Sequence, residues 1–176
     1  MAKIDHHAVV AALEFAHSHL DGMKVKELVD RKGIDGYITH CAALAATTGV
    51  TAGIGGPVTM LLGVPADMVN TIAQQFRVTL AVIYHRTGRY SVPFDQFIKI
   101  VGLSLGVKIG TQAAAYGVGV IAGQVAKEIV KRLSVRTAGK LIPLVGGVLG
   151  GSINYAFIKA QGKALLSLDL DRVAED

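Results

Sequence analysis

The sequence predicts an all-α protein: a single glycine-rich helical bundle with a small N-terminal helical cap. Three stretches lack Asp, Glu, Lys and Arg: Tyr37 to Ala66, Ile109 to Ala126 and Leu141 to Ile158. They are rich in Ala and Gly and lack the alternation of β-branched residues that is typical of strands. Glycines recur in them four residues apart, which on a helix places them on one face, where two backbones can approach closely. The spaced glycines expected to pack helices are Gly102, Gly106, Gly110, Gly119, Gly123, Gly146, Gly147, Gly150 and Gly151.

Composition favours one domain at or near a membrane. A chain of 176 residues is long enough to bury a substantial core. Hydrophobic residues make up 51% and charged residues 18%, against about 25% charged in ordinary soluble domains. The net charge of +5 suits an anionic surface. The aromatic residues do not alternate with Lys or Arg, which argues against binding to single-stranded nucleic acid.

Residues 1–33 are expected to form the N-terminal cap. One loosely amphipathic helix ends at Asp21 and Gly22, and a second, shorter one closes at Gly33. Acidic residues and four histidines interrupt the first 20 residues, unlike a secretory signal. Cys41 is the only cysteine, which excludes an intramolecular disulfide and fits a reducing compartment. We therefore expect a cytoplasmic protein associated with the inner face of the cell membrane.

Residues 34–168 are expected to form the bundle, and residues 169–176 a polar tail. A helix from Tyr37 to Ile54 is predicted to end at Gly55-Gly56-Pro57, because proline removes a backbone donor and clashes with the preceding turn. Val58 to Val64 is too short to span a bilayer, which needs about 20 residues. Pro65 opens the longest regular helix, which runs to about Arg86. Phe94 then starts a helix in which the glycines at 102, 106 and 110 face one side.

A polar stripe follows the predicted helix from Pro65, at steps of three and four residues. It either faces solvent or is a buried polar seam, whose members would need partners because an unpaired buried charge is costly. Lys108 and Asn154, which are isolated in apolar helices, are the partners expected in the second case. The seam would then fix helix packing rather than perform catalysis. Its expected members are Asp67, Asn70, Gln74, Arg77, Lys108 and Asn154.

A basic cluster lies at helical spacing between the second and third apolar runs. Its position beside apolar sequence favours contact with lipid headgroups over reading of a nucleic-acid groove, although a solvated helix face is the simpler single explanation. The expected membrane-surface residues are Lys127, Lys131, Arg132, Arg136 and Lys140.

Catalytic, cofactor and metal motifs are weak, and we expect no enzyme, no cofactor and no metal site. Gly102-Leu-Ser104-Leu-Gly106 matches the nucleophile-elbow pattern, but it lies in a predicted helix and no histidine follows it. Glu14 and His17 have the spacing of half a di-iron carboxylate site, but no second pair follows. The histidines at 6, 7, 17 and 19 lack a recognised zinc spacing. The glycine-rich segments lack the Lys-Ser/Thr of a phosphate-binding loop.

Two segments resemble the EcsC family of bacterial proteins. One is Val64-Pro-Ala-Asp67-Met, with Gln74, Gln75 and Arg77 in the same helix and Ile83-Tyr-His-Arg-Thr-Gly88 closing it. The other runs from Leu141 through Pro143, Gly146 to Gly151 and Asn154 to Gly162. The resemblance covers about residues 33–168. It implies an all-helical, membrane-associated protein without established enzymatic activity, and it assigns no catalytic residues.

The expected function is non-enzymatic: the protein binds or remodels a membrane that contains anionic lipid. If the glycine seams also mediate self-association, it does so as a homo-oligomer. The alternative is a soluble helical scaffold or regulator of a membrane transporter, in which the apolar helices are ordinary core. No nucleic-acid partner is expected.

Overall fold

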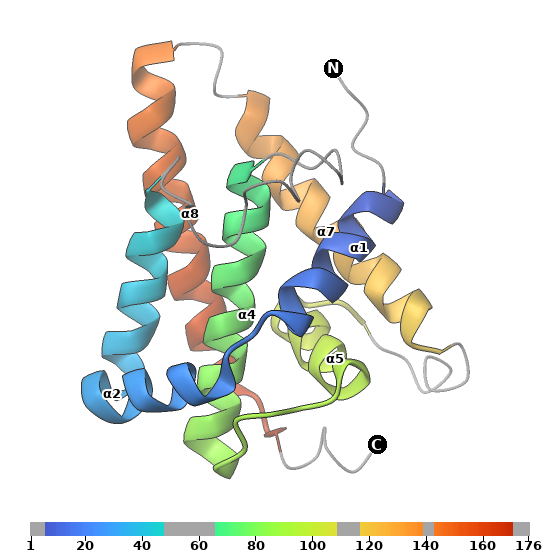
Figure 1. Ribbon diagram of the computed structural model, residues 1–176. Helices are drawn as coiled ribbons and strands as arrows, with labels where there is room; N and C mark the ends of the chain where they lie inside the picture. Colours follow the sequence, from blue (N-terminus) through green and yellow to red (C-terminus); the bar gives the residue numbers. More distant parts are fainter. Residues whose placement is uncertain (1–5, 48–65, 109–116, 139–142, 171–176) are drawn as a thin grey trace.

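The computed structural model describes residues 6–47, 66–108, 117–138 and 143–170. The side chains of residues 6, 66–67, 133–138 and 143–150 are outside the description. The described residues contain six α-helices and no strand, which confirms the all-α prediction (Figure 1). The helices are α1 (His6–Ser18), α2 (Gly22–Ala46), α4 (Ala66–Thr87), α5 (Phe94–Ser104), α7 (Val118–Ala138) and α8 (Pro143–Ser167).

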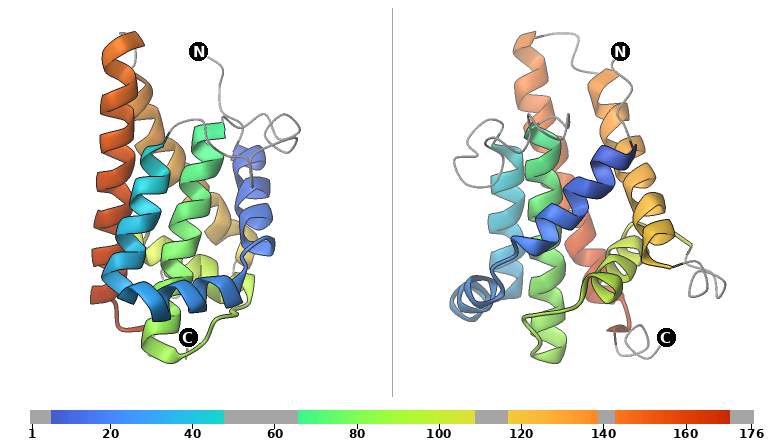
Figure 2. Two further views of the ribbon diagram at one scale, coloured as in Figure 1. Left: turned by 60° about the vertical axis from the view of Figure 1, so that its left-hand side comes forward. Right: turned by 45° about the vertical axis from the view of Figure 1, so that its right-hand side comes forward.

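Helix α4 is the centre of the bundle. It packs against α2 and α8 on one side and against α1 and α5 on the other, and the views in Figure 2 show α2, α4 and α8 running side by side. Its core side chains include Ile72, Phe76 and Val82, all fully buried. The prediction of one long helix from Pro65 to about Arg86 is thus confirmed over Ala66–Thr87. A helix buried on most sides must satisfy its polar side chains within the protein.

Helix α2 changes direction at Gly33. The backbone there has φ 70°, a left-handed conformation that glycine adopts without the steric penalty of a Cβ atom. The first part therefore runs across one end of the bundle, and the second part turns to run along α4 (Figure 1). The predicted helix boundary at Gly33 is confirmed. The predicted continuation of the helix to Ile54 lies outside the described residues beyond Thr47.

The first two helical segments share the main core. Val9 and Leu13 of α1 are fully buried and belong to the same hydrophobic cluster as Ile129 of α7 and Phe97 of α5. The side chains of Val25 and Val29 in α2 are also part of it. The predicted cap therefore packs directly onto the helices that follow it in sequence.

The expected helical stripe through Gly102, Gly106 and Gly110 is wrong at its second member. Helix α5 ends at Ser104, and Gly106 follows it with φ 72°. Its N–H donates to Leu103 O at 2.9 Å, and the N–H of Val107 donates to Gly102 O at 2.9 Å. These are the hydrogen bonds of a glycine that terminates a helix. Gly102 is buried within α5, and Gly110 lies outside the described residues.

Close packing at the glycines of α7 is also not found. A Cβ atom built on Gly119 or Gly123 would meet nothing within 4 Å. The side-chain surroundings of Gly146, Gly147 and Gly150 lie outside the description. Gly151 does meet the prediction, because a Cβ atom there would lie 2.8 Å from the backbone O of Ala46 in α2. Helices α8 and α2 therefore approach backbone to backbone at this point.

Candidate functional site

The polar stripe of α4 is a hydrogen-bonded chain at the contact with α2. Asn70 Nδ2 donates to Leu44 O at 3.0 Å, and Gln74 Nε2 donates to Asn70 Oδ1 at 3.1 Å. Arg77 Nη1 reaches Gln74 Oε1 at 3.5 Å. Gln74 is 3% exposed, so the stripe lies within the bundle and not in solvent. The structure thus favours the seam over the solvated face for these three residues.

The seam satisfies the end of α2. The last carbonyl groups of a helix have no partner within the helix and need donors from elsewhere. Asn70 supplies one to Leu44 O, and Asn154 of α8 supplies another to Ala45 O at 3.1 Å. Asn154 was expected to be a partner of the α4 stripe, and its amide instead bonds the carbonyl next to the one that Asn70 bonds. This arrangement ties the end of α2 to the first part of α4 and to the middle of α8.

One expected seam member does not join it, and another lies outside the description. Lys108 is exposed after the end of α5, and its expected burial as a partner of the stripe is wrong. The side chain of Asp67 lies outside the described residues. A lysine isolated in an apolar stretch looked buried in sequence, but the helix stops at Ser104 and leaves it in a turn.

The basic residues of α7 divide into two kinds. Lys127 and Lys131 are exposed, and the side chain of Lys131 is 77% exposed. Arg132 instead has a structural role, because its Nε donates to Glu128 Oε1 at 2.8 Å and its Nη2 donates to Leu105 O at 2.6 Å. The Arg132 guanidinium also lies over the Phe157 ring. Lys127 and Lys131 are therefore accessible to an anionic surface, although Lys131 Nζ also lies 3.9 Å from Glu128 Oε2, whereas Arg132 is held within the fold. Lys140 and the side chain of Arg136 lie outside the description.

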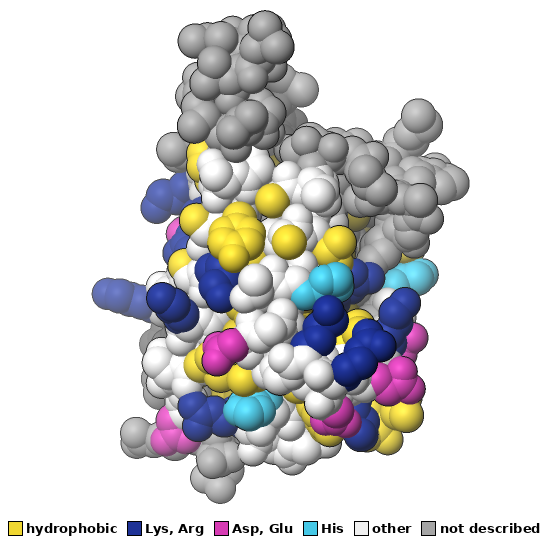
Figure 3. Space-filling model, turned by 90° about the vertical axis from the view of Figure 1, so that its left-hand side faces the viewer, with side chains coloured by type: hydrophobic (Ala, Val, Ile, Leu, Met, Phe, Trp, Pro, Cys, Tyr) yellow, Lys and Arg dark blue, Asp and Glu magenta, His cyan; other side chains and the backbone are white. Residues whose placement is uncertain are grey.

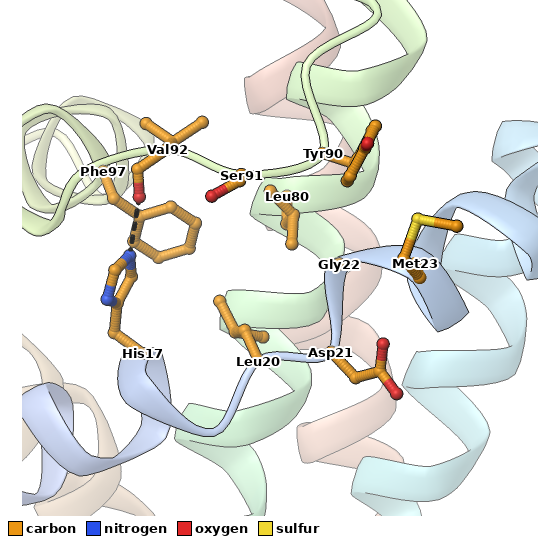
Figure 4. A pocket seen from close by; sticks show the side chains of 10 residues that line it. All are labelled: His17, Leu20, Asp21, Gly22, Met23, Leu80, Tyr90, Ser91, Val92 and Phe97. Carbon is orange, nitrogen blue, oxygen red and sulfur yellow. Dashed lines mark hydrogen bonds between the residues drawn. The ribbon is translucent and has the colours of Figure 1, made fainter.

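A pocket of about 280 Å³ lies where the start of α2 meets the loop before α5 (Figure 4). His17 lines it, and its Nε2 donates to Val92 O at 3.0 Å while its ring packs against Phe97. Asp21 also lines the pocket, and its carboxylate accepts a hydrogen bond from Lys24 N as the N-cap of α2. The side chains of His17 and Asp21 thus both bond the backbone at the edge of the pocket.

Two buried glutamines went unnoticed as site residues in the sequence. Gln75 is fully buried, and neither its Oε1 nor its Nε2 has a hydrogen-bond partner among the described residues. Gln161 Nε2 donates to Ser104 Oγ at 3.2 Å, but its Oε1 has no hydrogen-bond partner in the part of the chain that the structure describes. Ser104 Oγ in turn donates to Val101 O at 2.7 Å, which engages the serine of the elbow-like motif in helix packing. The periodicity of α4 shows that Gln75 follows the seam residue Gln74, but it does not predict that the Gln75 side chain is fully buried.

Positive charge gathers where α2 and α4 face each other. Burial lowers the pKa of His40, and the nearby charges of Lys32, Arg77 and Arg31 lower it further. The neighbouring Cys41 thiol is buried, which raises its pKa to about 11 and keeps it neutral at pH 7. Burial likewise raises the pKa of the Tyr37 phenol. The charged groups that act on His40 are therefore all cationic, and the Tyr37 phenol and the Cys41 thiol stay protonated at pH 7 and add no negative charge.

Apolar side chains are exposed on α8. Ile153 is 40% exposed and Tyr155 36% exposed, and Ala156 and Ala160 are also exposed. Figure 3 shows the face formed by α2 and α8, on which apolar side chains gather in the upper half with basic side chains around and below them. An exposed apolar patch beside basic residues is a common feature of surfaces that bind membranes or other proteins.

Within the described part of the chain, no set of three or more His, Cys, Asp and Glu residues is placed to hold a metal ion. None of the described helices combines the length and the apolar character needed to cross a bilayer. Comparison with protein-family models, with curated proteins and with solved structures finds no significant match. The resemblance to the EcsC family therefore stays a prediction that rests on the two segments quoted above.

Proposed function

We propose that the protein is a non-enzymatic, peripheral membrane protein that binds anionic bilayers with the glycine-rich end of its bundle and the adjoining face of α2 and α8. The observation that carries the proposal is that the described parts of two charge-free stretches lie at one end of the molecule. Helix α2 ends there at Ala46, α4 begins at Ala66, and α8 begins at Pro143 (Figure 1). The chain has no Asp, Glu, Lys or Arg from Tyr37 to Ala66 or from Leu141 to Ile158.

The distribution of side chains along α8 supports this orientation. Ile153 and Tyr155 expose apolar surface in the half of the helix nearer that end, and the first basic residue after them is Lys159. An apolar surface that enters the headgroup region gains about 25 cal/mol for each Å² removed from water. Lysines below it can extend their ammonium groups to lipid phosphates. Binding of this kind requires no spanning helix.

Flotation with liposomes tests the proposal. We expect the protein to float with vesicles that contain anionic phospholipid and to float less with phosphatidylcholine alone. Ile153→Glu should weaken binding about tenfold or more, because it removes an apolar contact of about 1.5 kcal/mol or more and adds a repelled charge. Met23→Glu is the matched control, because Met23 is 52% exposed in the first turn of α2, and the first part of α2 lies at the opposite end of the bundle (Figure 1). Equal loss in the two variants would contradict the proposed orientation.

The exposed lysines of α7 provide a second prediction. Lys127→Gln with Lys131→Gln should lower affinity for anionic vesicles about 30-fold at low salt, because each basic residue near such a surface contributes about 1 kcal/mol. The difference should shrink at high salt, where the charges are screened. Lys24→Gln with Lys99→Gln, at exposed or half-exposed positions elsewhere, gives the same net charge as a control. Complete absence of flotation for the wild-type protein would favour the alternative function, a soluble scaffold or a regulator of a membrane transporter. Oligomerisation on the bilayer is a separate prediction from the sequence, which flotation does not test.

A further inference from the structure

We infer that Arg77 of α4 and His40 of α2 form a binding site for a phosphate group, either on a lipid headgroup or as free phosphate. Asn70 of α4 bonds Leu44 O of α2, and the two helices pack against each other. His40 lies about one turn before Leu44 on α2, and Arg77 lies about two turns after Asn70 on α4. The lipid source of the phosphate rests on the proposed function. The site itself does not, and it can be tested without a membrane.

The first observation is the poor pairing of Arg77. A guanidinium has five N–H donors in a planar fork, but among the described residues Arg77 makes one hydrogen bond, the 3.5 Å contact with Gln74 Oε1. Its side chain is half-buried. The ion pairs of the described residues are Lys26 with Asp30 and Glu128 with Lys131 and Arg132, so none involves Arg77. A partly buried cation that no carboxylate neutralises lowers the stability of the fold, and an anion bound from solvent would offset this cost.

The second observation is that cations surround this position on more than one helix. Lys32 and Arg31 of α2 act on His40 together with Arg77. Lys159 of α8 donates from Nζ to Thr39 Oγ1 at 3.0 Å, beside His40 in sequence. Asp35 is the nearest acid along α2, and it is exposed and in no ion pair among the described residues. Tyr37 and Cys41 remain protonated, as argued above, and supply no negative charge.

The chemistry of these groups selects an oxyanion. The guanidinium fork matches two oxygens of a phosphate, and hydrogen bonds between charged partners are about twice as strong as neutral ones. A neutral or protonated imidazole can donate to a third oxygen. Arg77 makes only a long contact with Gln74, which Asn70 holds in turn, so most N–H groups of the fork have no partner among the described residues and can bind a ligand. Because His40 and Arg77 are both half-buried, a small anion can reach them from solvent.

The site also fits the proposed membrane orientation. Asn70 of the same seam contacts the end of α2 at Leu44, so Arg77 lies two turns of α4 further from the glycine-rich end. Arg77 lies eleven residues after Ala66, the first residue of α4, which corresponds to about 16 Å along the helix. An end of the bundle that enters the headgroup boundary by about 5–10 Å, as amphipathic helices do, leaves the site several Å outside that depth, on the side of the headgroups. A phosphate of the bound leaflet would then meet Arg77 and His40 when the apolar patch of α8 is inserted.

A proton NMR titration of His40 with inorganic phosphate tests the site. At constant ionic strength, phosphate should raise the pKa of His40 toward or above its ordinary value, because an anion favours the imidazolium. Arg77→Gln should raise the same pKa without phosphate and weaken phosphate binding about tenfold or more. Arg89→Gln is the control: Arg89 is an exposed arginine that bonds Gln96 Oε1 at 3.1 Å, and its variant should behave as wild type. A His40 pKa unchanged by phosphate would overturn the inference.

A second readout separates loss of the site from loss of the fold. His40→Gln should also weaken phosphate binding when measured by isothermal titration calorimetry, while its melting temperature stays near that of the wild type because the residue is only half-buried. Phosphate affinity that is the same in wild type, Arg77→Gln and His40→Gln would show that phosphate binds elsewhere, and would overturn the proposal.

Flotation distinguishes the two sources of the phosphate. Vesicles with phosphatidic acid present an exposed phosphate monoester, and free phosphate should compete with them if the headgroup uses this site. Binding of phosphate without any flotation would support a site for a soluble phosphate and contradict the proposed membrane function. Flotation that is indifferent to both Arg77→Gln and free phosphate would contradict the site and leave the membrane function standing.

Discussion

Replacing Gly22 with alanine is expected to lower the stability of the protein by about 3 kcal/mol, near the upper end of the cost of overpacking a close contact. A Cβ atom on Gly22 would lie 1.9 Å from the carbonyl oxygen of Tyr90 and 3.0 Å from its carbonyl carbon. The obstacle is backbone, which cannot swing aside as the end of a flexible side chain can. The start of α2 or the loop before α5 must move, and both line the pocket in Figure 4. For a chain of this size we expect the melting temperature to fall by about 10 °C.

Gly123→Ala is the matched control for this variant. Gly123 lies inside α7, and a Cβ atom there would meet nothing within 4 Å. Alanine is favoured over glycine in a helix interior by about 0.5–1 kcal/mol, so this variant should melt slightly higher than the wild type. Both melting temperatures can be followed by far-ultraviolet circular dichroism. A Gly22→Ala protein as stable as Gly123→Ala would mean that α2 does not meet the Tyr90 backbone as closely as described.

The glycines show what sequence spacing can and cannot predict. Spacing of four places Gly119 and Gly123 on one helix face, but it does not say whether another helix covers that face, and none of the described residues does. Gly162 was not among the expected packing glycines because it has no partner four residues away. A Cβ atom there would nevertheless lie 2.8 Å from Ile38 Cγ2 of α2. Close approach depends on where the neighbouring helix lies, which is a property of the tertiary fold.

Helix boundaries were predictable where a local signal decides them. Gly33 ends one helical segment because only its left-handed backbone allows the turn, and the sequence before it already loses its apolar periodicity. Helix α4 was predictable because its apolar positions repeat over six turns. Gly106 was misplaced inside a helix because apolar residues continue past it, and its terminating hydrogen bonds have no signature in composition.

The polar residues also divide into those whose role a local sequence signal predicts and those whose role depends on a tertiary contact. Asn70 and Asn154 were expected to be seam residues because an amide in an apolar helix needs a partner, and both have one at the end of α2. Arg132 was expected at a membrane surface, since its charge resembles that of Lys127 and Lys131 in the sequence. Its contact with Leu105 O joins residues 27 positions apart, and only the folded chain brings them together. The sequence thus indicated which groups need partners better than it indicated which partners they find.

Gln75→Met is expected to stabilise the protein, by about 1–2 kcal/mol. Gln75 is fully buried with both amide atoms unpaired among the described residues, and an unsatisfied buried polar group costs about 1–3 kcal/mol. Methionine keeps the length and flexibility of the side chain and removes the polar atoms, so it should fill the same space without strain. The urea midpoint should rise while the slope of the transition stays the same, which separates a stability change from a change in the unfolded state.

The same substitution at the neighbouring residue, Gln74→Met, is expected to lower the stability of the protein. Gln74→Met makes the same chemical change one position earlier in α4, where the amide bonds both Asn70 and Arg77. Loss of those bonds leaves Asn70 Oδ1 and the Arg77 guanidinium with fewer partners in a buried seam, which should lower stability by about 1–3 kcal/mol. The two variants should therefore shift the urea midpoint in opposite directions. Destabilisation by both would mean that Gln75 has hydrogen-bond partners in solution, and that the polar interior of α4 is satisfied along its whole length.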